Sequence, residues 1–285
     1  MKILIVDGPG VHPRTAARAL GSGLHAKGHG VIVHPLQMEK LGWFKSQSLS
    51  RRAIQVLEVH QPDVVHVLSS EPWVADAFTG RGVSVVHSAL DRSSGADWVV
   101  APSRQALARM GRQAPTGENR SSVFPYPILI GETPGHPGGY VLAHVPKGDR
   151  IARKWINEAG ALHRDIPIRF EGNPEEARVV VSMTSREELW PIGVAEAMAA
   201  GRPVIAGWNG VASEFVLEGV TGYLSAPGDI QSLAMHLQVL WSRPEEAVTL
   251  GLAGREEAAA HFGSEEQVRT LLRWYLRAGV SRLAV

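Results

Sequence analysis

The sequence of 285 residues contains no cysteine, and this absence removes several kinds of chemistry at once. Without thiols the chain forms no disulfide, binds no metal through thiolates and has no cysteine nucleophile. It also lacks any apolar run of the roughly 18–20 residues that a membrane-spanning helix needs. The apolar run at residues 2–6 is too short for a signal peptide. We therefore expect a cytoplasmic protein.

A strong net charge is missing as well, because 29 Lys and Arg residues oppose 28 Asp and Glu residues. The balance is uneven, since residues 1–130 hold 14 basic and 9 acidic residues, or +5, and the remainder carries −4. A basic front half indicates an anionic partner such as a phosphate, a lipid headgroup or a nucleic acid. A solvated surface with a chance asymmetry explains the same counts equally well.

Short apolar runs alternate with amphipathic segments along the whole chain. Helical spacing predicts helices at 14–27, 48–60, 150–163, 193–200, 230–242 and 245–280. Strands are predicted at 2–6, 31–33, 63–68, 83–87 and 98–101, and again at 140–144, 166–170, 179–181 and 203–206. This alternation predicts parallel βαβ units in two doubly wound, Rossmann-like α/β domains.

A glycine- and proline-rich segment without hydrophobic periodicity, residues 131–139, separates the two series of strands and helices. It is the best candidate for a linker and for a hinge. We place the domains at 1–134 and 135–264, followed by a closing helical segment at 265–285.

The most informative stretch runs from residue 182 to residue 205. Glu188 lies in a loop that follows a predicted parallel strand, and open α/β sheets bind ligands at that end of their strands. Pro191 and Gly193 mark the start of a helix, whose free backbone N–H groups favour phosphate. Glu196 lies about one turn into this helix. Without the surrounding motif, the two carboxylates would be ordinary surface acids near a helix start.

In context, Glu188, seven intervening residues and Glu196 resemble the E-x7-E signature of retaining GT-B glycosyltransferases of family 4. The run from Glu196 through Ile205 resembles the same family, as do Glu214–Val216, Gly219–Leu224 and Pro227–Asp229. The resemblance implies a GT-B architecture with an interdomain cleft. In it, 1–134 is the acceptor-side domain, 135–264 binds the nucleotide-sugar donor and 265–285 packs back on the N-terminal domain.

The resemblance also implies a reaction and roles for the motif residues. The chain would move a hexosyl group from a nucleotide sugar to an acceptor with retention of anomeric configuration. The donor, a UDP- or GDP-sugar, is a substrate, so no cofactor is expected. Glu188 would contact the donor sugar and Glu196 the nucleoside ribose. The backbone around Pro191, Ile192 and Gly193 would bind the diphosphate.

Two residues of the first half resemble further parts of the family's site. His87 ends the run Val85–Ser88, which resembles a strand end near the donor sugar. Gly10 belongs to the turn Asp7–Gly10, which resembles the glycine turn after the first strand. We assign a catalytic role to His87 and a donor-binding role to Gly10. A structural histidine and a plain turn are the alternatives.

The cationic part of the site departs from the family pattern. Family members place an Arg and a Lys after the first strand of the second domain, where they offset the charge of the leaving diphosphate. Lys147 matches the lysine and is expected to be catalytic, but residues 142–144, where the arginine is expected, hold none. Arg150, Arg153 and Lys154 are the substitutes, and we assign donor binding to Arg150 and Lys154. With no Asp-x-Asp pair and no metal-ligand spacing of histidines, we expect no metal.

Three alternatives depend on specific features of the sequence. Lys147 and Glu188 are only 41 positions apart, so a βα unit that helps frame the nucleotide base in the family is missing. This keeps open a non-catalytic relative that binds a nucleotide sugar or a partner. A nucleotide-sugar epimerase is a further alternative. A dinucleotide oxidoreductase is disfavoured, because Gly8 and Gly10 lack the third glycine of G-x-G-x-x-G.

The acceptor is left open among a small metabolite, a glycan, a lipid phosphate and a modified nucleic-acid base. Trp43, Phe44 and Lys45, with Arg51 and Arg52, form a candidate patch for peripheral membrane contact. Partly buried core aromatics are the alternative there. No obligate protein partner is evident.

Overall fold

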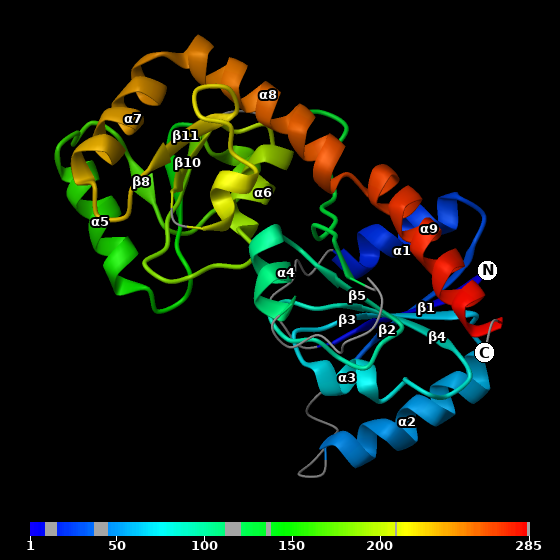
Figure 1. The fold of residues 1–285 in the computed structure, drawn as a ribbon. Helices are drawn as coiled ribbons and strands as arrows, with labels where there is room; N and C mark the ends of the chain where they lie inside the picture. The colour runs from blue at the N-terminus through cyan, green and yellow to red at the C-terminus, as the bar shows by residue number, and fades with distance from the viewer. Residues whose placement is uncertain (9–15, 37–44, 112–120, 135–137, 209, 284–285) are drawn as a thin grey trace. The chain divides into compact units, whose positions relative to one another are not determined.

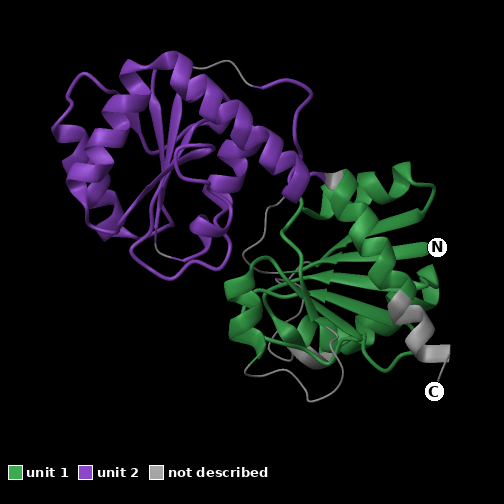
Figure 2. Ribbon diagram, turned by 45° about the horizontal axis from the view of Figure 1, so that its top comes forward, with its two compact units in different colours: residues 1–127, 264–285 green, residues 128–263 purple. Residues whose placement is uncertain are grey.

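The structure, a computed structural model, describes residues 1–8, 16–36, 45–111, 121–134, 138–208 and 210–283. The chain divides into two compact units (Figure 2). Unit 1 comprises residues 1–127 and 264–285, and unit 2 comprises residues 128–263. Each unit contains one parallel sheet with helices on its faces (Figure 1). The predicted pair of doubly wound α/β domains is therefore confirmed.

Unit 1 has a six-stranded parallel sheet in the order β2-β1-β3-β4-β5-β6. Its strands are β1 (Lys2–Asp7), β2 (Gly30–Pro35), β3 (Val64–Leu68), β4 (Ser84–Ser88), β5 (Trp98–Ala101) and β6 (Ser121–Val123). Its helices are α1 (Ala16–Ala26), α2 (Lys45–His60), α3 (Pro72–Asp76), α4 (Arg104–Gly111) and α9 (Ser264–Leu283). All five residues of β3 are buried, as the mostly apolar sequence of that strand predicts.

The two faces of this sheet follow from the alternation of side chains along each strand. Leu4 and Val6 of β1 point to one face, where they pack with Leu49 of α2 and Val74 of α3. Helices α1 and α9 lie on the other face (Figure 1). The last helix of the chain therefore completes the core of the first unit.

A buried histidine joins α9 to the centre of the sheet. His66 of β3 is fully buried, with Nδ1 2.6 Å from the hydroxyl of Tyr275 in α9 and Nε2 2.7 Å from the hydroxyl of Ser88. Burial lowers the pKa of His66 to about 3, and nearby His87 adds to the shift. The ring is therefore neutral at pH 7, and both of its nitrogens have partners.

Unit 2 has a five-stranded parallel sheet in the order β11-β10-β9-β7-β8. Its strands are β7 (Val141–His144), β8 (Ile168–Arg169), β9 (Val179–Ser182), β10 (Val204–Gly207) and β11 (Gly222–Ser225). Its helices are α5 (Arg150–Ala161), α6 (Ile192–Ala199), α7 (Ile230–Ser242) and α8 (Pro244–Phe262), with 3-10 segments η2 (Pro174–Glu176) and η3 (Val211–Glu214). Helices α5 and α7 share one core cluster with β7 and β9.

An aromatic cluster supports the loop that holds the motif. Trp190 is 1% exposed and packs edge-on against Phe215 and Phe262, with ring centroids 5.7 and 5.5 Å away. Phe262 is the last residue of α8, so the motif loop and the end of α8 share one core. Trp190 therefore anchors the motif loop in the core of unit 2.

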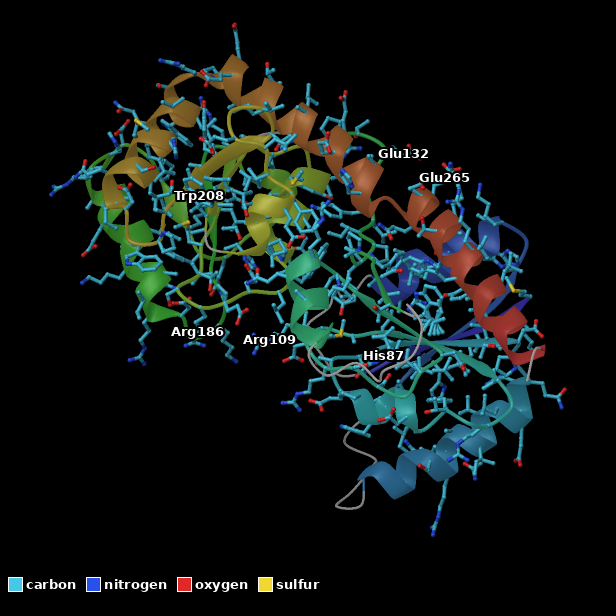
Figure 3. All side chains as sticks on the ribbon, viewed as in Figure 1. His87, Arg109, Glu132, Arg186, Trp208 and Glu265 are labelled. Atoms are coloured by element: carbon cyan, nitrogen blue, oxygen red, sulfur yellow. The ribbon has the colours of Figure 1, made fainter. Side chains whose placement is uncertain are left out.

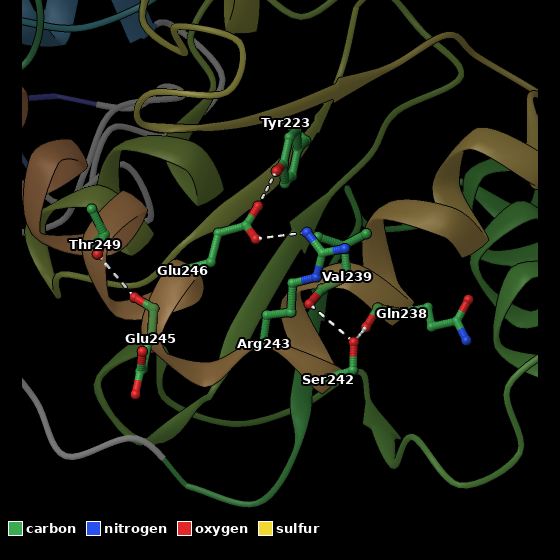
Figure 4. Close-up of polar contacts among 8 residues, drawn as sticks. All are labelled: Tyr223, Gln238, Val239, Ser242, Arg243, Glu245, Glu246 and Thr249. Atoms are coloured by element: carbon green, nitrogen blue, oxygen red, sulfur yellow. Dashed lines mark hydrogen bonds and ion pairs between the residues drawn. The ribbon is translucent and has the colours of Figure 1, made fainter.

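Polar contacts fix the corner between α7 and α8 against β11 (Figure 4). The Tyr223 hydroxyl donates to Glu246 Oε1 at 2.6 Å, and Arg243 donates to Oε2 of the same carboxylate at 3.2 Å. The hydrogen bond to Glu246 is the main cause that raises the pKa of Tyr223 to about 12, and burial is the second cause. This corner serves the fold, since it holds the start of α8 beside the edge strand.

Two parts of the chain differ from the sequence-based elements. The helix predicted at 245–280 ends at Phe262 and restarts at Ser264, because the backbone of Gly263 is extended (φ −62°, ψ 136°) and leaves the helix. A Cβ atom at this position would overlap the carbonyl of Ala259. Part of the expected linker folds into unit 2. The carbonyl of Gly131 accepts from Arg255, and the N–H of Gly138 donates to the Glu176 carbonyl at 2.9 Å.

Candidate functional site

The strand order of unit 2 creates a site at the carboxyl edge of its sheet. The chain leaves β7 to form β8 on one side and then returns to form β9 on the other side of β7. Open α/β sheets bind ligands where the winding reverses in this way, outside the carboxyl ends of the strands. The loop after β7 (residues 145–149) and the loop after β9 (residues 183–190) meet at that point. They carry Lys147 and Glu188.

Asp149 joins these two loops. Its carboxylate accepts from the backbone N–H of Ala152 at 3.0 Å, which caps α5. It also accepts from the N–H of Ser185 at 2.7 Å, the hydroxyl of Ser185 at 2.6 Å and the hydroxyl of Thr184 at 3.2 Å. Burial acts to raise the pKa of Asp149, but these hydrogen bonds outweigh it and lower the pKa below its ordinary value. Asp149 therefore stays ionised and holds together the loops 145–149 and 183–190, which form the two sides of the candidate crevice.

Glu188 is half-buried in the second loop, and no described residue forms an ion pair or hydrogen bond with its carboxylate. Burial raises its pKa to about 7. A carboxylate held in this way, at the ligand-binding edge of a sheet, is typical of a functional group and not of a solvated surface acid. It can accept a hydrogen bond from a ligand, or donate one when protonated.

The start of α6 lies beside Glu188 and offers a backbone donor. Pro191 precedes the helix, and no side chain caps it. The N–H of Ile192 already donates to the Trp190 carbonyl at 3.0 Å. The N–H of Gly193 has no partner among the described residues. Of the three residues expected at the diphosphate, Gly193 therefore presents the available donor.

Gly193 is required there for a steric reason. A Cβ atom at this position would overlap Nδ1 of His144 and lie 2.8 Å from the Ser182 hydroxyl oxygen. The first turn of α6 thus approaches the ends of β7 and β9 as closely as a backbone can. Glu196, on the next turn, is half-buried, and burial raises its pKa.

Exposed cations surround a pocket of about 320 Å³ beside the loop after β7. Lys147, Arg150 and Arg153 line it, and the guanidinium of Arg153 lies 3.8 Å from the ring centroid of Phe170. Lys154 is not among the lining residues and instead lies 3.6 Å from Glu158. The structure thus brings Lys147 and Arg150 together and turns Lys154 toward a neighbouring acid.

The residues expected from unit 1 have different positions. His87 is fully buried, with Nδ1 2.8 Å from the hydroxyl of Ser94 and Nε2 2.9 Å from the carbonyl of Ser69 (Figure 3). Burial lowers the pKa of His87 to about 4. Its ring reaches a ligand only if one of these bonds opens. Gly10 lies outside the described residues, as do Trp43, Phe44 and the side chain of Lys45.

Three comparisons with known proteins bear on this site. Residues 173–257 match the family model described as Glycosyl transferases group 1. That segment contains both Glu188 and Glu196. A curated D-inositol 3-phosphate glycosyltransferase from Kribbella flavida is 27% identical over 175 residues, or 61% of this chain. The match spans 39% of the length of that relative.

Solved structures resemble the whole chain. Sucrose-phosphate synthase from Thermosynechococcus elongatus matches with a TM-score of 0.72 and 16% identity, over 99% of this chain and 100% of the other. HepE from Anabaena, in complex with UDP and glucose, matches with a TM-score of 0.68 and 17% identity, over 96% and 98%. At such identities the likeness shows the fold, and it confirms the GT-B class. Together with the family match, it supports a glycosyltransferase.

Sequence reasoning assigned no role to three residues that shape this crevice: Asp149, Ser185 and His144. Asp149 carries a visible signal, since an acid directly before a helix is a usual N-cap. Nothing in the sequence indicates that the same carboxylate binds a loop 36 positions away. His144 ends β7, and its contact with Gly193 exists only in the folded unit.

No described helix is both long and apolar enough to cross a membrane. Within the same residues, no group of three or more His, Asp or Glu side chains is arranged to hold a metal ion.

Proposed function

We propose that this chain is a retaining glycosyltransferase of the family 4 type, which moves a hexosyl group from a nucleotide sugar to an acceptor. One observation carries the proposal. Where the strand order of unit 2 reverses (the switch point), Glu188 is half-buried and has no ion-pair or hydrogen-bond partner among the described residues. It lies beside the start of α6, which no side chain caps, within the segment that matches the glycosyl transferases group 1 family. Because HepE was solved with UDP and glucose, a UDP-sugar is the first donor to test, and a GDP-sugar the second.

The donor would lie along the carboxyl edge of the unit 2 sheet. The N–H of Gly193 donates to the diphosphate, with Pro191 and Ile192 setting the backbone. Lys147 and Arg150 supply positive charge where the leaving group develops negative charge, which is the largest electrostatic contribution available here. Lys154 lies further out and adds long-range attraction.

The two glutamates would hold the two ends of the donor. Glu188 accepts from or donates to hydroxyls of the transferred sugar, and Glu196 binds the hydroxyls of the nucleoside ribose. Both are half-buried with raised pKa values. Bringing hydrogen-bond donors to them in a desolvated crevice therefore relieves part of the penalty of burying a carboxylate.

The reaction would proceed on one face of the sugar. The bond between the anomeric carbon and the β-phosphate oxygen breaks, and the electron pair leaves with the nucleoside diphosphate. The acceptor oxygen bonds to the same face of that carbon and passes its proton to the departing phosphate oxygen. Since no metal is needed in this scheme, the cations and the Gly193 N–H carry the charge stabilisation.

Five further expectations from the sequence stay predictions. They are a catalytic role for His87, a donor contact at Gly10, independence of metals, a cytoplasmic location and peripheral membrane contact. The acceptor stays open among a small metabolite, a glycan, a lipid phosphate and a modified nucleic-acid base.

A thermal-shift titration tests the proposal directly. Wild type, Glu196→Ala and the matched control Glu256→Ala, an exposed acid on α8, are titrated with UDP-, GDP-, ADP- and TDP-sugars. A specific donor raises the melting temperature by mass action. We expect one nucleotide class to stabilise wild type and Glu256→Ala but not Glu196→Ala. No shift with any donor at millimolar concentration would contradict a donor site in this crevice.

Turnover separates the enzyme from its alternatives. NMR of the first-formed product, with the stabilising donor and candidate acceptors, is expected to show a glycoside with the anomeric configuration of the donor. Binding without any product favours the non-catalytic relative. A changed sugar still attached to its nucleotide favours the epimerase.

A further inference from the structure

Residue 186 offers a positive charge at the crevice that the sequence pattern does not predict. Arg186 lies in the loop after β9, two residues before Glu188, and is exposed at the lower edge of unit 2 in Figure 3. Its Nη2 donates to the carbonyl of Gly148 at 3.2 Å. Gly148 directly follows Lys147, so the Arg186 guanidinium reaches from the loop after β9 (residues 183–190) to the loop after β7 (residues 145–149).

The backbone of Arg186 is held firmly. Its N–H donates to the Thr184 hydroxyl oxygen at 3.0 Å, and its carbonyl accepts from the same hydroxyl at 3.2 Å. Thr184 Oγ1 also lies 3.2 Å from Asp149 Oδ2, so its single hydrogen is shared between the Arg186 carbonyl and the carboxylate that fixes both loops. A cation on so constrained a backbone loses little further freedom when it binds a ligand.

The guanidinium also has free donors. A guanidinium carries five N–H groups, and one bond, to Gly148, accounts for the described contacts of this one. No carboxylate of the described residues forms an ion pair with it. Among the acids close to Arg186, Asp149 already accepts four hydrogen bonds, the adjacent Glu187 is exposed to solvent and Glu188 is half-buried.

We propose that Arg186 binds the diphosphate of the donor opposite Lys147, and thereby supplies the arginine that the loop after β7 lacks. The inference rests on the proposed function. A planar guanidinium pairs with two phosphate oxygens through a rigid fork of parallel N–H groups, a geometry that the Lys147 ammonium does not provide. The family pattern places both cations after one strand, whereas this chain takes them from the loops of two neighbouring strands, β7 and β9.

Calorimetric titration with UDP, together with an NMR titration with uridine, tests this assignment. UDP contains the diphosphate and uridine does not. We expect Arg186→Gln to weaken UDP binding by about 10- to 100-fold, the loss of a hydrogen-bonded charge contact, and to change uridine binding by less than twofold. Arg186→Lys keeps the charge without the fork and is expected to lie between wild type and Arg186→Gln. Arg164→Gln removes an exposed cation from the loop before β8, at the opposite edge of the sheet, and is expected to bind both ligands like wild type.

Each other outcome has a defined meaning. UDP binding by Arg186→Gln within twofold of wild type overturns the assignment and leaves the proposed function intact, provided that Lys147→Gln binds UDP more weakly. Equal losses for UDP and uridine overturn it too, because they show that Arg186 only supports the loop. If Arg186→Gln does not fold, Arg186→Lys is measured in its place. Wild-type affinity of Arg186→Lys for UDP would then overturn the paired contact between the guanidinium and two phosphate oxygens. If wild type binds no nucleoside diphosphate, the proposed function and this inference both fail.

Discussion

Ser185 donates two hydrogen bonds to one carboxylate, that of Asp149, through its backbone N–H at 2.7 Å and its hydroxyl at 2.6 Å. The same carboxylate caps α5 through the N–H of Ala152. One buried ion therefore fixes both the start of a helix and the distance between the loops after β7 and β9. The shape of the candidate donor crevice depends on that ion.

Replacing Asp149 is expected to destabilise unit 2 more than the loss of a helix cap does. Asp229 is the matched control, since it caps α7 through the N–H of Ser232 at 3.0 Å and is exposed. We expect Asp229→Ala to lower the free energy of unfolding by about 1 kcal/mol. Asp149→Ala leaves buried donors without an acceptor and is expected to lower it by about 2–4 kcal/mol. Urea unfolding followed by circular dichroism measures both.

Acidity provides the check on this prediction. The pKa of Asp149 is lowered in the folded protein, so its contribution to stability is present above the ordinary carboxyl pKa and is lost as the pH falls through the lowered value. The difference between wild type and Asp149→Ala should therefore shrink in acid. If Asp149→Ala and Asp229→Ala lower the free energy of unfolding by the same amount at neutral pH, Asp149 does not bridge the two loops.

Glu188 has the opposite linkage. Burial raises its pKa to about 7, so the folded protein binds a proton more tightly than the unfolded chain between about pH 4.5 and 7. Burying the charged carboxylate therefore lowers the free energy of unfolding fully above pH 7, where the folded protein has lost the proton. Below about pH 4.5, where the carboxyl group is protonated in both states, it has no effect. We expect Glu188→Gln to be more stable than wild type by about 2 kcal/mol at pH 8 and equal to it below pH 4.5, the magnitude being reduced for partial exposure.

Carbon-detected NMR of the glutamate carboxyl groups follows the same group directly. One resonance is expected to titrate near pH 7 in wild type and to be missing in Glu188→Gln. A Glu188 resonance that titrates near 4.5 would show a solvated acid, contrary to its proposed place in the crevice.

Gly193 is expected to tolerate no side chain. Gly193→Ala places a Cβ atom into His144 and 2.8 Å from the Ser182 hydroxyl, so the start of α6 must move. Overpacking of this kind lowers stability by about 1–3 kcal/mol, and the displaced N–H should weaken UDP binding at least tenfold. In the control Gly139→Ala the Cβ atom meets nothing within 4 Å, and neither quantity should change. Calorimetry and thermal unfolding measure the pair, and equal behaviour of the two variants would contradict the close approach.

Much of the fold was predictable because each long element has a strong local pattern. The strands of unit 1 that are buried on both faces read as apolar runs, and α5 and α7 begin at Asp149 and Asp229, which are good N-caps. The missed elements are short or weakly patterned. Helix α3 has 5 residues, β6 has 3, and β11 combines glycine, tyrosine and serine in 4 residues. Helix α4, with 8 residues, was missed as well.

The site was predictable only where a motif stands in one stretch of sequence. Glu188, Glu196 and Gly193 come from such a stretch, whereas the bond from Arg186 to Gly148 joins positions 38 apart. Sequence spacing also does not reveal burial. His87 has a position that suits a ligand contact, yet both of its ring nitrogens bind inside unit 1. These contacts depend on which strands become neighbours, and no local pattern encodes that.

The return of the chain to unit 1 has a consequence for synthesis on the ribosome. Unit 2 is one continuous stretch, whereas unit 1 needs α9, where Trp274 stacks on Trp98 at 6.2 Å and Tyr275 reaches His66. The first 127 residues therefore emerge early, but the part of their sheet that α9 covers, beside β4, stays exposed until residues 264–283 are made. Because unit 2 is complete at residue 263, we expect this later-made unit to close its core before unit 1 does, so that the units fold in the reverse of the order in which their synthesis begins.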